Sequence, residues 1–245
     1  MKKIIIIGAG AMGSAFTVPC LENKNEVTLI GTHLEDELIN NIQLNKNFHP
    51  ALNIELPAKL KVEKYERLKS ILEGGVDIIV AGVSSIGIAW FVDQIAKNYK
   101  KNLPIILLTK GLAIEDNELI TLSDKIKKLL NQKGHEEVNV SAIKGPCLAA
   151  GLANKMRTGT VIANPNIKEA QNLKKIVSTE YYSTEISDDL TGIELSGAIK
   201  NIYSMLIGAS KGLSNSKAPK EIQSKYYLNT SASLIHRSIS EMVEF

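Results

Sequence analysis

The chain has 245 residues, of which 44% are hydrophobic and 22% are charged, and its formal net charge is +3. This composition is typical of a folded protein with one large domain, or with one domain and part of a second. The basic residues are scattered, and only three of them are arginine. Nucleic-acid-binding proteins usually carry a basic stripe that is rich in arginine. The composition therefore argues against a nucleic-acid partner.

The two cysteines, Cys20 and Cys147, lie far apart in the sequence. They have neither the spacing of metal ligands nor that of a disulfide framework, which favours a reducing compartment. We therefore expect no bound metal.

The N-terminus resembles a signal peptide at first sight, because two lysines precede an uncharged run from Ile4 to Leu21. The strongly apolar part of this run is only Ile4–Ile7, and glycines follow it. A short apolar run that ends at glycines is more typical of a buried parallel strand. No other segment predicts a membrane span, so we expect a cytoplasmic protein without an integral membrane segment.

Strand and helix patterns alternate along the first 188 residues. Strands are expected at 2–8, 26–31, 76–83, 103–111, 138–146, 159–165 and 180–187. Helices are expected at 11–22, 35–44, 66–73, 86–98, 117–133 and 167–176, with a short helix after 146 and a loop over 47–57. This alternation predicts an α/β fold, a Rossmann-like, doubly wound and mainly parallel sheet with helices on both faces.

The pattern changes near residue 189, where the strands stop. A long helix is expected through 194–213, with Asp188, Asp189 and Thr191 as candidate N-caps. A polar loop over 211–221 and a second helix over 221–243 follow. We therefore expect two domains, a nucleotide-binding domain over 1–188 and the start of an all-helical domain over 189–245.

The long helix carries Lys200 and Asn201 among small residues. An apolar stripe at helical spacing predicts that the helix faces a core; it consists of Leu195, Ile199, Ile202 and Leu206. One interpretation of Lys200 is a side chain that extends its charge to water. The other is a lysine held in a site, where small neighbours leave room for a ligand.

Three glycines, Gly8, Gly10 and Gly13, follow the first strand in GxGxxG spacing and open a helix. In that context the first glycine makes a tight turn, the second lets the backbone approach a pyrophosphate, and the third lets helix and strand pack closely. The helix N-terminus supplies free N–H groups and positive potential for the anion. The sequence therefore predicts a dinucleotide site here.

The residues after the second strand bear on the choice of cofactor. An acid at this point would bind the ribose 2′-hydroxyl of NAD, but the chain has Gly31, Thr32 and His33, and its first acid is Glu35. Thr32 and His33 can donate to a 2′-phosphate. We expect NADP, or tolerance of both NADP and NAD.

Two further turns lie at the same edge of the predicted sheet. Lys110 lies at the C-terminal end of the strand expected over 103–111, and Gly145 lies at the C-terminal end of the strand expected over 138–146. Ligands bind at the carboxyl edge of open parallel sheets, so these turns and the glycine loop around Gly8 converge on one site.

The motifs together resemble one family. They are "GAGAMGSA", the "HP…LP" loop from His49 to Pro57, "TKGL", "GPCLAAGLA", "ELSGAIKNIYSMLIGASKGL" and "NTSASLIHRSISEM". Their order and spacing resemble NAD(P)-dependent glycerol-3-phosphate dehydrogenase across essentially the whole chain. The resemblance implies reversible reduction of dihydroxyacetone phosphate, a small phosphorylated three-carbon substrate, to sn-glycerol 3-phosphate, which supplies phospholipid synthesis.

The resemblance also implies roles for individual residues. Lys200 matches the proton donor and acceptor, and Lys110 matches a lysine that touches both cofactor and substrate. Further cofactor contacts are implied for Ala11, Met12, Thr32, His33 and Ala149, and further substrate contacts for Gly145, Cys147 and Asn201. A lysine that is shielded from water beside a second lysine should have a lowered pKa, which suits proton exchange near neutrality.

The sequence departs from the family pattern at its end. The family continues with an aspartate and an arginine-asparagine pair, whereas this chain stops at Phe245, so we expect a truncated helical domain. Two other hypotheses stay open, another dehydrogenase with a Rossmann and a helical domain, and a non-catalytic NADP-binding module. The sequence leaves open whether the chain forms a homodimer.

Overall fold

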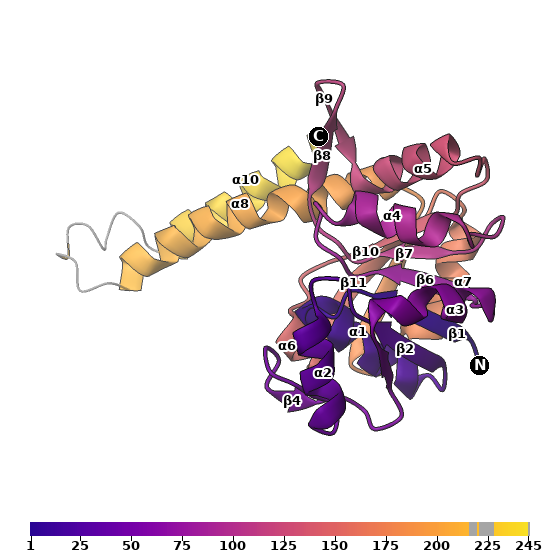
Figure 1. Cartoon of the computed structure of the whole chain (residues 1–245). Coiled ribbons are helices and arrows are strands. Elements are labelled where there is room, and N and C mark those ends of the chain that lie inside the picture. Colours follow the sequence, from indigo (N-terminus) through magenta and orange to yellow (C-terminus); the bar gives the residue numbers. More distant parts are fainter. Residues whose placement is uncertain (216–219, 221–227, 245) are drawn as a thin grey trace.

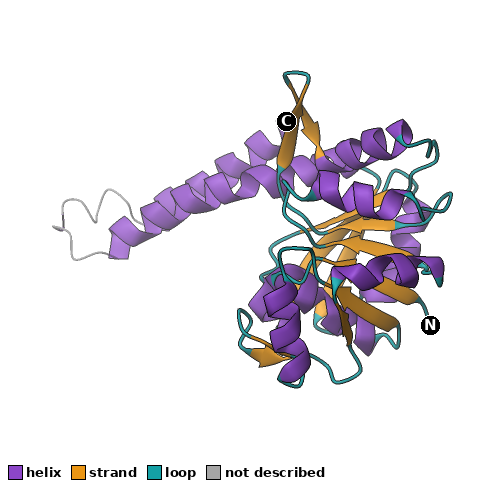
Figure 2. Ribbon diagram, viewed as in Figure 1, coloured by secondary structure: helices purple, strands orange, loops and turns teal. Residues whose placement is uncertain are grey.

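A computed structural model of the chain describes residues 1–215, 220 and 228–244. An eight-stranded sheet lies between two layers of helices, with strand order β12-β11-β10-β7-β6-β1-β2-β5 (Figure 2). Its strands are β1 (Lys3–Ile7), β2 (Glu26–Ile30), β5 (Lys61–Glu63), β6 (Ile78–Ala81), β7 (Ile105–Leu107), β10 (Val140–Lys144), β11 (Thr158–Ala163) and β12 (Tyr182–Ser187). Only β10 and β11 pair antiparallel within this sheet, so the predicted doubly wound, mainly parallel fold is confirmed.

Helices cover both faces of this sheet. They are α1 (Ala11–Glu22), α2 (Asp36–Leu44), α3 (Leu68–Glu73), α4 (Ile88–Ala96), α5 (Leu122–Gln132), α6 (Ala149–Ala153) and α7 (Ile167–Val177). Helices α1, α2, α6 and α7 pack on one face, and α3, α4 and α5 pack on the other. The chain then continues into α8 (Leu190–Asn215) and α10 (Leu228–Glu244).

The central strand β1 explains the apolar run near the N-terminus. Ile4 and Ile6 point into the core beneath α1, while Ile5 and Ile7 point into the core beneath α4. Successive side chains of a strand alternate between its faces, so a strand covered on both faces needs an unbroken apolar run. No helix of the described residues is long and apolar enough to cross a membrane.

The expected helix over 117–133 is wrong at its start. Residues 118–121 form strand β9 (Glu118–Thr121), which pairs antiparallel with β8 (Leu112–Glu115) in a separate hairpin. Asp116 and Asn117 make its two-residue turn with positive φ values of 53° and 62°, as a tight hairpin of this kind requires. Helix α5 begins only at Leu122, where the Thr121 hydroxyl caps the Asp124 N–H.

Three smaller differences from the expected elements also occur. The edge strand β5 was not expected, and the loop over 47–57 contains a short hairpin of β3 (Phe48–His49) and β4 (Ile54–Glu55). Helix α8 runs to Asn215, so the first residues of the expected polar loop are helical. Residues 221–227 of the second expected helix lie outside the described residues.

Helices α8 and α10 lie side by side and project from the α/β part of the molecule (Figure 1). Asp189 is the N-cap, because its Oδ1 accepts the N–H of Gly192 at 2.8 Å. The start of α8 packs on β10 and β11. The outer part does not, and Ile202 and Leu206 are 57% and 50% exposed. The expected core-facing stripe is therefore wrong beyond Lys200, because α8 leaves the sheet there.

Candidate active site

The glycine loop lies where the winding of the sheet reverses, between β1 and β6. A Cβ on Gly8, whose φ is +108°, would meet the backbone of Gly82 at 2.7 Å, and a Cβ on Gly13 would collide with the Gly8 carbonyl. These contacts explain the first and third glycines of the motif. Gly82, which follows β6, was missed because it belongs to no motif.

The second glycine faces open space. A Cβ on Gly10 would meet no protein atom within 4 Å. Gly10 is also the N-cap of α1, which has no side-chain cap and no acidic residue in its first turn. Ala11 and Met12 therefore begin a helix whose N–H groups and positive end are open to an anion. These residues fit the pyrophosphate of a dinucleotide cofactor.

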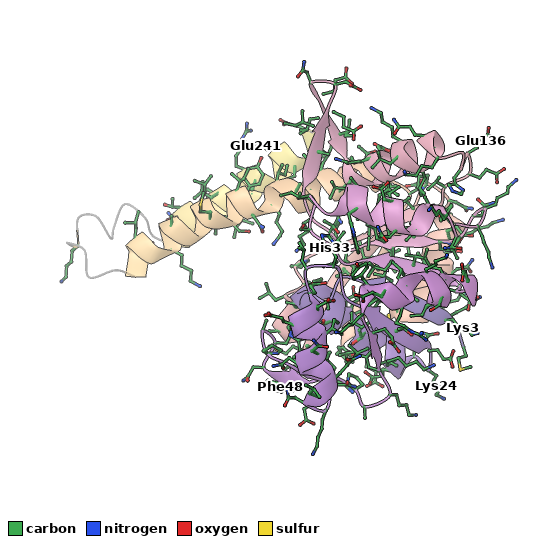
Figure 3. The ribbon with its side chains drawn as sticks, in the orientation of Figure 1. Lys3, Lys24, His33, Phe48, Glu136 and Glu241 are labelled. Carbon is green, nitrogen blue, oxygen red and sulfur yellow. The ribbon has the colours of Figure 1, made fainter. Side chains whose placement is uncertain are left out.

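Thr32 and His33 follow β2 in the chain, and His33 lies on the side of the domain where the helix pair projects (Figure 3). Thr32 is half-buried, whereas His33 is exposed. The His33 ring lies 5.1 Å from that of Trp90 and 6.3 Å from that of Tyr65. These three rings form an aromatic cluster near the end of β2.

Glu35 corrects the expectation that no carboxylate lies at the end of β2. Its Oε2 accepts the N–H of Thr32 at 2.8 Å and the N–H of Ala9 at 3.0 Å. A carboxylate is therefore present at the end of β2 although the first residues after the strand are not acidic. The turn after Thr32 folds the Glu35 side chain back toward the end of β2, and the spacing of residues in the sequence does not reveal this.

Lys110, Gly145, Cys147 and Met12 line one narrow pocket at the carboxyl ends of β7 and β10. The pocket brings together predicted residues from the glycine loop and from both later turns. Gly145 has a φ of +154°, and a Cβ there would meet the Gly159 carbonyl at 2.8 Å. Ala149 begins α6 next to this turn and is half-buried.

Lys110 and Lys200 are close enough to influence each other. Lys110 is exposed at the surface, but partial desolvation lowers its pKa, the positive charge of Lys200 lowers it further, and Cys147 raises it. Lys200 is half-buried on α8, and its charge acts on the turn that carries Lys110. Its neighbour Asn201 is exposed.

A third lysine, Lys144, was missed by sequence reasoning. It is 4% exposed, and its Nζ donates to the carbonyls of Leu107, at 3.3 Å, and of Thr109. Burial lowers its pKa to about 8, with Glu194 acting in the opposite direction and Lys110 in the same direction. A lysine at the end of a strand usually points to solvent, so its sequence position gave no signal of burial.

Glu194 faces Lys144 from α8. It is 1% exposed and accepts the N–H of Ser123 at 3.3 Å, and burial raises the pKa of its carboxyl. Gly197, one turn further along α8, lies against the methylene groups of Lys144, at 3.2 Å from an added Cβ. The small residue in the helix therefore makes room for a buried lysine.

An open anion cradle at the switch point of a doubly wound sheet marks a dinucleotide-binding protein, and the lysines beside it can exchange a proton with a substrate. Comparison with known proteins narrows this class to one family. Residues 3–170 match the NAD-dependent glycerol-3-phosphate dehydrogenase N-terminus, and residues 189–245 match the C-terminus of the same family. The chain belongs to the NAD-dependent glycerol-3-phosphate dehydrogenase family, as the sequence predicted.

Individual relatives agree with this assignment. The chain is 33% identical over 98% of its length to an NADP(+)-dependent glycerol-3-phosphate dehydrogenase of Archaeoglobus fulgidus, and covers 68% of that protein. It is 28% identical over 99% of its length to a glycerol-3-phosphate dehydrogenase [NAD(P)+] of Shouchella clausii, and covers 66% of it. The crystal structure of the Coxiella burnetii glycerol-3-phosphate dehydrogenase superposes with a TM-score of 0.78 at 25% identity, over 98% of this chain and 67% of that one. The chain thus spans about two thirds of the length of these relatives.

Proposed function

We propose that this chain carries out NAD(P)-dependent, reversible reduction of dihydroxyacetone phosphate to sn-glycerol 3-phosphate. The observation that carries the proposal is that the charge of Lys200 acts on Lys110, while Lys110 lines the same pocket as Met12 of the glycine loop. A bound nicotinamide cofactor supplies the hydride for such a reaction. The names of the relatives support this substrate and this cofactor class.

The two lysines have distinct roles in the proposal. When the substrate carbonyl is reduced, its oxygen needs a proton, which Lys200 donates and, in the reverse direction, accepts. Lys110 places a second positive charge near that oxygen and stabilises the negative charge that develops there. Burial and the neighbouring Lys200 lower the pKa of Lys110, so this turn is suited to proton chemistry closer to neutrality. Gly145, Cys147 and Asn201 complete the proposed substrate contacts.

The residues after β2 bear on the choice between NADPH and NADH. Thr32 and His33 as donors, together with the NADP-dependent relative, support NADPH binding at least as strong as that of NADH. We further propose a domain boundary at 188/189, a cytoplasmic location and no metal requirement. Among the described residues, no group of three or more histidine, cysteine, aspartate or glutamate side chains is placed to hold a metal ion.

The test is the variant Lys200→Met. Removal of a positioned acid–base group should lower kcat by about 10²–10⁴-fold, while NADPH affinity in a calorimetric titration stays within about twofold. The assay follows NADPH oxidation with dihydroxyacetone phosphate as substrate.

Lys211→Met is the matched control, because Lys211 is exposed on the same helix. It should leave kcat unchanged. Near-normal turnover by both Lys200→Met and Lys110→Met would contradict the proposal. Binding of NADPH without turnover by the unaltered chain would instead identify a cofactor-binding module.

A further inference from the structure

The loop from His49 to Pro57 has no role in the site described so far. His49, in β3, is 1% exposed and reaches the glycine loop, where its Nε2 lies 3.0 Å from the Ala9 carbonyl oxygen. Its Nδ1 accepts the N–H of Leu52 at 3.2 Å. A ring nitrogen that accepts a hydrogen bond carries no proton. The ring proton is therefore on Nε2, which donates a hydrogen bond to the Ala9 carbonyl oxygen. Phe48, the neighbour of His49, marks this part of the molecule in Figure 3.

The peptide groups of Ala9 are held by three side chains. His49 and Ser14, whose Oγ donates at 2.9 Å, hold the carbonyl. The Glu35 carboxylate accepts the N–H at 3.0 Å. Ala9 lies between two glycines and is itself fully buried. These side chains therefore fix a segment that glycine would otherwise leave free to rotate.

The hydrogen bonds from His49 and Ser14 to the Ala9 carbonyl determine where the next amide, that of Gly10, points. In a planar trans peptide the Ala9 C=O and the Gly10 N–H point in opposite directions. Because the carbonyl is turned toward His49 and Ser14, the Gly10 N–H points away from them. It has no acceptor within the residues that the structure describes. A binding group that is already aimed loses less conformational freedom when its ligand binds.

We propose that His49 is a positioning residue that holds the glycine loop in its anion-binding conformation, so that the "HP…LP" loop tunes cofactor affinity without touching the cofactor. This proposal rests on the dinucleotide site proposed above. The proposal assigns a function to His49, which lies outside the glycine motif in the sequence but contacts the glycine loop in the fold.

Two substitutions separate the hydrogen bond from packing. In His49→Gln the side-chain amide nitrogen can take the place of Nε2 and still donate to Ala9. In His49→Asn the side-chain amide takes the place of Nδ1, so its oxygen can accept from Leu52 while the bond to Ala9 is lost. Both variants remove the ring, so a packing effect is common to both.

NADPH affinity is measured by calorimetric titration of the full chain and of both variants. We expect His49→Asn to weaken binding about tenfold, the equivalent of one hydrogen bond, and His49→Gln to weaken it by less than about threefold. Equal losses in the two variants would overturn the proposal, since His49 would then act through packing alone.

A second readout does not depend on cofactor binding. The exchange rate of the buried Ala9 amide, measured by NMR in the free proteins, should rise in His49→Asn and stay near that of the unaltered chain in His49→Gln. Equal exchange in all three proteins would overturn the proposal. If the unaltered chain bound neither NADPH nor NADH, the proposed function would fail while this measurement still decided the role of His49.

Discussion

Glu35 places a negative charge where the adenosine end of a cofactor would lie. Its carboxylate accepts two backbone amides, those of Ala9 and Thr32. Sharing by two N–H groups offsets part of the charge, but a 2′-phosphate near Thr32 would still be repelled. Thr32 and His33 act in the opposite direction as donors. We expect the balance among these three residues to set the preference between the two cofactors.

The variant Glu35→Gln tests this balance. Glutamine keeps an oxygen for both amides and removes the charge, so we expect NADPH to bind about three- to tenfold more tightly, with NADH changed less than about twofold. Calorimetric titrations with both cofactors at one salt concentration give the ratio. Glu37→Gln, at an exposed position in α2, is the control. The same change for both cofactors would show that the charge of Glu35 does not select between them.

Strands β7 and β10 and helix α8 meet at one buried ammonium. Lys144 at the end of β10 donates to two carbonyls at the end of β7, and Glu194 of α8 offsets part of its charge. The turn with Lys110 and the helix with Lys200 are thus joined through a side chain that lies in neither. Burial of this ammonium is costly, and its pKa falls from 10.5 to about 8.

The free-energy cost of burying the Lys144 ammonium makes the stability of the protein depend on pH. Well below the folded-state pKa of about 8, Lys144 is protonated in both the folded and the unfolded chain, and the free-energy cost of its burial is fully present. Between about pH 8 and 10.5 the folded chain has lost this proton while the unfolded chain still binds it, so stability rises with pH. The gain is on the order of 3 kcal/mol at most.

Lys144→Met removes this titration. Urea unfolding at several pH values from 7 to 10.5 should show a less positive slope of the free energy of unfolding against pH than in the unaltered chain. Other groups that titrate in this range, apart from the coupled Lys110, are common to both proteins and cancel in the comparison. Lys24→Met, at an exposed position, should keep the original slope. Parallel curves for Lys144→Met and the unaltered chain would contradict a lowered pKa of Lys144 in the folded protein.

At the scale of the whole molecule, the site lies along the carboxyl edge of one sheet. The proposed cofactor contacts run from the end of β2 past β1, and the lysines follow at β7 and β10. Ligand held across several strands stabilises the fold that assembles them, because the unfolded chain has no such site. Cofactor binding should therefore appear in the thermal stability of the chain.

We expect NADPH at about 100 times its dissociation constant to stabilise the fold by about 2.7 kcal/mol. For a chain of 245 residues this raises Tm by about 5–10 °C. Gly10→Val is the matched variant. An added Cβ meets no protein atom within 4 Å, so its Tm without cofactor should change little, while the shift with NADPH should vanish. An equal shift in the variant, measured by scanning calorimetry, would exclude the glycine loop as the pyrophosphate site.

Local patterns in the sequence determined the fold class and the family. The run Ile4–Ile7 and the glycine spacing after it predicted a central strand and a phosphate turn, because each depends on neighbouring residues alone. The strand and helix alternation likewise predicted the sheet. The β8–β9 hairpin was missed, since the pattern after Asn117 also fits a helix, and only the pairing with β8 selects the strand.

Contacts between distant segments could be decided only by the tertiary structure. The burial of Lys144 depends on carbonyls more than thirty residues away in the chain, and His49 reaches Ala9 across forty residues. Ile202 follows the helical periodicity of a core residue and is nevertheless exposed, because α8 has left the sheet there. Periodicity records which face of an element is apolar, whereas burial and hydrogen-bond partners depend on what the fold places against that face.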